Sequence, residues 1–284
     1  MFLERWPDND AARFCCLLLR RYLRHNVGIR GAALAFYLLF SIFPFLIFIS
    51  ALLGLLRLDG AEILAEVAEL LPREAVELLG MYLRHVREHS SMRLALFGLV
   101  FSVWFPLRAA NALLRAVRAA YHLGPPRAGA GHWLRTLLAT GVLVGGIALT
   151  LTVMTAGERL LDWAGSRMLL PAILAEVWLW LRFPVAAAAG FAALLALYAL
   201  AQDGRRRKRE LWPGAAAALA VWLGASWLYA LYVEHFADYS LLYGSIGAVM
   251  VLLVWLYLSA VVLIMGAEVN GVLTALRRER AEGP

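Results

Sequence analysis

The chain has 284 residues, of which 62% are hydrophobic and only 17% are charged. Soluble domains are about half apolar and about a quarter charged, so a soluble fold of this length could not bury so many apolar side chains. The composition excludes an ordinary soluble domain. It predicts an all-α, multi-pass helix bundle, because helices satisfy their backbone hydrogen bonds within lipid.

Residues 1–30 are predicted to form a cytoplasmic segment with an interfacial amphipathic helix at residues 11–24. The side chains expected at the interface are Phe14, Leu17, Leu18 and Tyr22. Those expected to meet anionic headgroups are Arg13, Arg20, Arg21 and Arg24. Membrane lipids with anionic headgroups are therefore expected partners. The adjacent Cys15 and Cys16 predict no disulfide framework.

The first apolar stretch covers residues 31–56 and contains Tyr37, Ser41 and Pro44 at spacings of four and three. Pro44 removes a backbone donor and is expected to bend the helix. Ser41 is expected to satisfy the carbonyl that Pro44 frees. Tyr37 and Ser41 are thus candidate substrate-binding residues at a broken helix, and an ordinary packing kink is the alternative.

Residues 57–93 are predicted to lie on the external side of the membrane. Between Glu62 and Glu77, acidic side chains recur at helical spacing and Pro72 separates two short amphipathic helices, which we expect at the outer surface.

The second apolar stretch, residues 94–107, is short for a span, which needs about 20 residues. It qualifies only if the helix continues past Arg108. The polar residues that follow at spacings of three, four, three and four are Arg108, Asn111, Arg115, Arg118 and His122. They form one stripe on a helix, which we interpret as a candidate binding track for an anionic solute or lipid headgroup. The alternative is a helix leaving the membrane, with arginines reaching the phosphates.

Four further stretches cover residues 136–157, 183–201, 211–233 and 239–267. Gly141 and Gly145 in the first of these are expected to allow close helix approach. With the N-terminus in the cytoplasm, cytoplasmic segments hold 19 Lys and Arg residues and external segments hold 8. The positive-inside rule therefore predicts six spans with both termini cytoplasmic, and the basic turn at residues 205–209 is the strongest marker.

Glu268 and Asn270 follow the sixth stretch, and both are candidate substrate-binding residues. Glu268 is expected to pair with Arg108 or Arg115, or to relay protons. The resulting organisation is a six-helix transmembrane domain at residues 31–271, followed by a basic cytoplasmic tail at 272–284.

The motifs of common enzymes are absent from the sequence. It has no HExxH, no Walker lysine and no GxSxG. We therefore expect no catalytic residue, no metal, no cofactor and no nucleic-acid partner.

Three blocks of the sequence carry a family resemblance. They are AALAFYLLFSIFP at 32–44, Trp104 with NALLRAV at 111–117, and YGSIGAVMVLLVWLYLSAVVLIMGAEVN at 243–270. With these the chain resembles the YihY/BrkB family of bacterial inner-membrane proteins over nearly its whole length. The resemblance implies six helical spans in the inner membrane. The family once carried a tRNA-processing ribonuclease label, generally regarded as a misassignment, and some members are associated with serum resistance or envelope lipid export.

Three functions are compared. The favoured one is a transporter or flippase for an anionic amphiphile or small anion in envelope biogenesis. The alternative is a non-transporting scaffold for envelope-assembly partners. An enzyme would require metal-dependent turnover and is the least supported. A homo-oligomer remains open, as do the substrate and the coupling ion.

Overall fold

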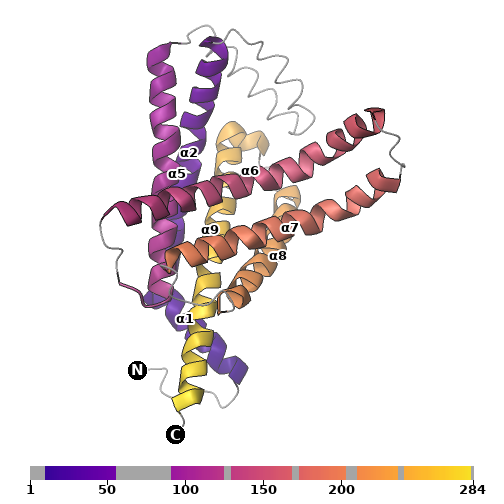
Figure 1. The fold of residues 1–284 in the computed structure, drawn as a ribbon. Helices are drawn as coiled ribbons and strands as arrows, with labels where there is room; N and C mark the ends of the chain where they lie inside the picture. The colour runs from indigo at the N-terminus through magenta and orange to yellow at the C-terminus, as the bar shows by residue number, and fades with distance from the viewer. Residues whose placement is uncertain are drawn as a thin grey trace. The chain divides into compact units, whose positions relative to one another are not determined.

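The structure is a computed structural model that describes residues 10–55, 91–124, 129–167, 173–202, 210–235 and 240–282. These residues form helices joined by turns, with no strand in any described segment (Figure 1). The helices are α1 (Asp10–Arg24), α2 (Val27–Leu55), α5 (Met92–Ala120), α6 (Ala130–Arg167), α7 (Ile173–Ala201), α8 (Trp212–His235) and α9 (Ser240–Glu282). The predicted all-α fold is confirmed.

Six of these helices are long and apolar enough to cross a membrane. The candidate spans are Val27–Ile49, Met92–Ala120, Ala130–Thr150, Trp180–Ala201, Trp212–Glu234 and Val249–Glu279. The second is the informative one, because α5 continues without a break through Pro106 and Arg108. The apolar stretch at residues 94–107, which is too short to span a membrane by itself, is therefore part of a 29-residue helix that also carries the polar residues. His122 does not belong to that stripe, since it follows the end of α5 in a turn with φ of 54°.

The chain divides into two compact units, one of residues 37–108 and one of residues 1–36 with 109–284. In the first unit, the parts of α2 and α5 pack closely at Gly98. A Cβ atom there would lie 2.6 Å from the backbone nitrogen of Phe48. Aromatic rings continue this contact, with the centroids of Phe40 and Phe105 5.9 Å apart.

In the larger unit, α6 packs along α7, α8 along both α7 and α9, and α1 against α9 (Figure 1). Small residues set the closest approach between α8 and α9. A Cβ atom at Gly214 would collide with the carbonyl oxygen of Gly266, and one at Gly266 would lie 2.6 Å from the Cβ of Ala218 on α8 and would collide with the hydroxyl of Tyr198 on α7. Tyr198 in turn donates a 2.6 Å hydrogen bond to the Leu263 carbonyl and so joins α7 to α9.

The amphipathic helix predicted at residues 11–24 is confirmed as α1, but its faces differ from the prediction. The four side chains expected at the interface are half-buried, whereas Leu19 and Leu23 are exposed. Arg13 pairs with Glu279 at 2.6 Å. This contact places the first and last described helices side by side. The predicted outer helices around residues 62–77 and the basic turn at 205–209 lie outside the described residues.

Candidate functional site

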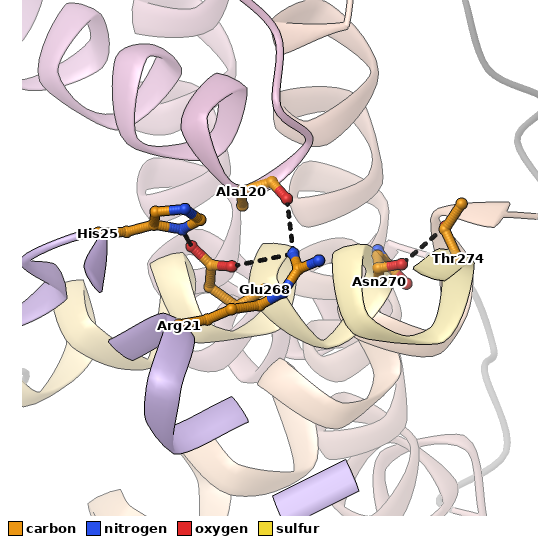
Figure 2. A network of polar contacts seen from close by, with 6 residues as sticks. All are labelled: Arg21, His25, Ala120, Glu268, Asn270 and Thr274. Carbon is orange, nitrogen blue, oxygen red and sulfur yellow. Dashed lines mark hydrogen bonds and ion pairs between the residues drawn. The ribbon is translucent and has the colours of Figure 1, made fainter. Parts of the chain in front are cut away.

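A buried carboxylate, that of Glu268 on α9, is the centre of a polar cluster inside the larger unit (Figure 2). Its Oε1 lies 2.6 Å from Nδ1 of His25. Its Oε2 lies 3.5 Å from Nη1 of Arg21, which is an ion-pair distance without a hydrogen bond. The Glu268 side chain is fully buried, and the other two are each 12% exposed. An isolated charge inside a protein costs several kcal/mol of desolvation free energy. Glu268 can be buried because Arg21 of α1 and His25 of the following turn contact its carboxylate.

The turn between α1 and α2 explains how these partners reach Glu268. Arg21 and His25 are four residues apart, so they lie on the same side of the chain as α1 ends. The His25 amide still donates to the Arg21 carbonyl at 2.9 Å. Asn26 then takes a left-handed conformation, with φ of 51°, which asparagine tolerates better than most residues. The chain thereby changes direction and enters the first span.

The C-terminal end of α5 completes the cluster. Arg21 also donates a 3.1 Å hydrogen bond to the carbonyl oxygen of Ala120. The last carbonyls of a helix lack intrahelical partners and carry partial negative charge, so the guanidinium is stabilised there as well. Gly271 makes room for this contact, because a Cβ atom there would lie 2.5 Å from both groups. The ring of His122 stands edge-on to that of His25, with centroids 5.7 Å apart.

Asn270, two residues further along α9, forms a separate network. Its Oδ1 accepts a hydrogen bond from the Gly214 amide at 2.7 Å. Its Nδ2 donates to the Leu211 carbonyl at 2.7 Å and to the Tyr121 hydroxyl at 3.0 Å. Gly214 lies in the first turn of α8, where amides have no intrahelical acceptor. Asn270 therefore caps α8 from a neighbouring helix, as an N-cap side chain would do locally.

Arg118 is also part of the architecture. Its side chain is buried, and it donates to the Gly124 carbonyl at 3.1 Å and to the Ala201 carbonyl at 3.0 Å. These bonds connect the C-terminal ends of α5 and α7. The guanidinium of Arg118 therefore stabilises the partial negative charge of carbonyl groups at the C-terminal ends of two helices, and groups within the protein already stabilise its own charge.

The other predicted residues of α5 lie differently. Arg115 is exposed, and Asn111 is half-buried with an Oδ1 atom that has no hydrogen-bond partner among the described residues. Arg108 belongs to the smaller unit, is exposed, and stacks its guanidinium 5.0 Å from the ring centroid of Trp104. The predicted pairing of Glu268 with Arg115 is therefore wrong, because the carboxylate takes Arg21 and His25 instead.

Tyr37 and Ser41 also belong to the smaller unit, and both are half-buried. Ser41 donates a 2.6 Å hydrogen bond to the Leu38 carbonyl. The carbonyl that Pro44 leaves without its helical donor is that of Phe40, four residues earlier. The predicted compensation by Ser41 is therefore wrong, and α2 accommodates Pro44 within one continuous helix.

Sequence reasoning missed Arg21 and His25, since it assigned the arginine to lipid headgroups and gave the histidine no role. The available signal was their four-residue spacing at the inner end of an amphipathic segment. Nothing in the sequence links them to Glu268, which lies 243 residues after His25. Within the described part of the chain, no three His, Cys, Asp or Glu side chains are grouped as metal ligands would be.

Comparison with known proteins gives the family. The sequence model of a family described as Virulence factor BrkB matches residues 18–284. A Bacillus subtilis protein named putative ribonuclease-like protein YfkH is 30% identical over 94% of this chain and 97% of its own length. UPF0761 membrane proteins of Chromohalobacter salexigens and Pseudomonas aeruginosa are 30% and 26% identical over 92% and 91% of this chain. The chain spans 63% and 62% of those two relatives.

No solved structure matches the chain. The named relatives and the six apolar helices fit a multi-pass protein of the bacterial inner membrane. The match to the family model extends over most of the sequence, including α2 and all the helices that follow it. This protein therefore belongs to the BrkB virulence factor family of integral membrane proteins.

Proposed function

We propose that this protein moves an anionic amphiphile or a small anion across the inner membrane during envelope biogenesis. The observation that supports this proposal is a pair of exposed arginines on the spanning helix α5. Arg108 and Arg115 are seven residues apart, so they lie on the same face of the helix, two turns from each other. Asn111 lies between them on that face.

The energetics of a charged span explain why these arginines support transport. A cation in a transmembrane segment costs about 3 kcal/mol on insertion scales and usually faces a partner or a water-filled path. Arg118 has such partners in two backbone carbonyls. Arg115 makes no hydrogen bond or ion pair with any described residue, and Arg108 stacks on Trp104. A phosphate or carboxylate would offer either guanidinium group the paired hydrogen bonds that it prefers.

Lipid movement in reconstituted vesicles tests the proposal. Vesicles contain fluorescent phosphatidylglycerol or fluorescent phosphatidylcholine, and dithionite bleaches the outer leaflet. The intact protein is expected to move the anionic lipid faster than the zwitterionic one. The double variant R108A/R115A is expected to lose at least about tenfold in rate, since each lost charge-assisted contact is worth about 1.5 kcal/mol or more.

Arg93 provides the matched control, because it is an exposed arginine at the other end of α5. R93A removes one positive charge from the same helix and is expected to leave the rate unchanged. Equal rates for the intact protein and R108A/R115A would refute this mechanism, as would equal loss in R93A. Thermal unfolding in detergent verifies that all variants are folded.

A second candidate function is a non-transporting scaffold for envelope-assembly partners. The observation that favours it is the structural use of the polar side chains Asn270 and Arg118, whose hydrogen bonds join α5, α7, α8 and α9. The scaffold predicts no movement of either lipid by the intact protein, together with stable co-purification of a single envelope partner. The ribonuclease-like name of the Bacillus relative describes that protein, and we infer no catalytic step for this chain.

A further inference from the structure

The outward face of α1 carries an exposed apolar strip. Ala11, Cys15, Leu19 and Leu23 recur every four residues, and all four are exposed. Leu19 and Leu23 are 63% and 65% exposed, far above what large apolar side chains show when they pack inside a protein. Because the four share one side of the helix, they form a continuous strip and not scattered surface residues.

Two arginines fix which side of α1 points outward. Arg13 contacts Glu279, and Arg21 contacts both Glu268 and the Ala120 carbonyl. These bonds hold α1 against α9 and determine its rotation about its own axis. The exposure of the apolar strip is therefore imposed by the rest of the larger unit.

A basic strip runs beside the apolar one. Arg20 and Arg24 each follow a leucine of the strip, about 100° further round the helix, and both are exposed. Neither makes a hydrogen bond or ion pair with another described residue. Residues 11–24 contain no acidic side chain, so α1 itself contributes only basic charges here. The acidic group at this side of the helix is Glu279 of α9, which pairs with Arg13.

We propose that this face of α1 docks on the anionic leaflet of the bilayer, with the apolar strip at the acyl boundary and the two arginines on lipid phosphates. The bilayer is the occupant that the position favours, because the candidate span of α2 begins at Val27, three residues after α1 ends. Ile29 at that entry is 71% exposed and extends the apolar surface toward the span. The positive charge complements anionic headgroups, and an apolar face beside arginines is the usual composition of an interfacial helix. This inference goes beyond the proposed transport and does not depend on it.

Cys15 lies on the strip and gives a native position for a probe. The full chain with Cys16→Ser is labelled at Cys15 with an environment-sensitive fluorophore. It is then placed in nanodiscs of phosphatidylcholine alone or of phosphatidylcholine with phosphatidylglycerol, both containing brominated phosphatidylcholine as quencher. In the anionic discs we expect blue-shifted, strongly quenched emission that high salt reverses. In R20Q/R24Q the ratio of docked to undocked helix should fall about tenfold or more, given about 1 kcal/mol for each basic residue at an anionic surface.

The matched control is R277Q/R278Q, which removes the same charge from exposed arginines near the end of α9. It is expected to leave the quenching unchanged. A probe that remains in water in the anionic discs would overturn the proposal. Quenching that is the same in both kinds of disc and unchanged in R20Q/R24Q would also overturn it. Emission that shifts only when two proteins share a disc would also overturn it, because a second copy would then cover the strip.

Discussion

At the scale of single residues, Glu268 is where one substitution should change stability most. E268A removes a fully buried carboxylate and leaves the guanidinium of Arg21, only 12% exposed, without its counter-charge. Breaking a buried pair from one side costs about 3 kcal/mol or more. We expect a denaturant titration of the protein in detergent to show that the free energy of unfolding falls by that amount.

The pair between Arg13 and Glu279 is the control for this prediction, since its side chains are 36% and 54% exposed. E279A should cost less than about 1 kcal/mol, because water replaces the lost partner. The double variant R21M/E268M should recover most of the E268A loss, since no charge is then left unpaired. Equal losses in E268A and E279A would show that Glu268 has no special role in the fold.

Asn270 supports a second prediction at this scale. N270A deprives the Gly214 amide, the Leu211 carbonyl and the Tyr121 hydroxyl of one partner each, and should cost about 2 kcal/mol. N270D keeps an acceptor for the amide but cannot donate to the other two groups, so it should be no better than N270A. Thermal unfolding measures both. In the control T140V, a hydroxyl that bonds only within its own helix is lost, and little change is expected.

The sequence identified Glu268 and Asn270 because polar residues beside a long apolar run are conspicuous. It could not identify their partners. Hydrophobic periodicity reports which face of a helix is apolar, but not which helix lies opposite. The contact of His25 with Glu268 depends on how α1 returns against α9, and that depends on the tertiary fold.

At the scale of the helices, α8 offers a paired test of close packing. G214A would place a Cβ atom against the Gly266 carbonyl and the Asn270 amide group, so α8 must move away from α9. Overpacking of this kind costs about 1–3 kcal/mol. G224A adds the same atom on the same helix where nothing lies within 4 Å, and should be neutral or slightly stabilising. Detergent unfolding compares them, and similar effects for both would contradict the packing argument.

Helix positions were largely predictable, because a span must be long and apolar wherever it packs. Helix ends and contact residues were not. Gly141 and Gly145 were expected to allow close approach, yet neither has an atom within 4 Å of an added Cβ, whereas Gly146 would lie 3.1 Å from the Ala193 Cβ. A one-residue step turns a position by about 100° around a helix, and composition alone does not say which side meets the neighbour.

At the scale of the whole molecule, the number of crossings follows from two independent observations. The described helices give six candidate spans. The contact of Arg13 with Glu279 requires the start of α1 and the end of α9 to lie on the same side of the bilayer, which an odd number of crossings would prevent. Neither observation says which side that is. The count of basic residues predicts that this side is the cytoplasm, with 19 of them on the side of the termini and 8 on the other.

Orientation is therefore the last prediction, and thiol labelling tests it. In a background with C15S and C16S, single cysteines are introduced as S91C before α5 and R278C near the end of α9, both at exposed positions. The positive-inside rule predicts that an impermeant maleimide labels S91C in intact spheroplasts and R278C only after permeabilisation. T140C, inside the α6 span, should react in neither state.

Labelling of R278C in intact spheroplasts would invert the assignment. Labelling of both positions there would mean an even number of crossings between them, against the five described helices α5 to α9. Because five crossings separate the two positions in this fold, they must react from opposite sides, and that requirement holds whichever side the arginines select.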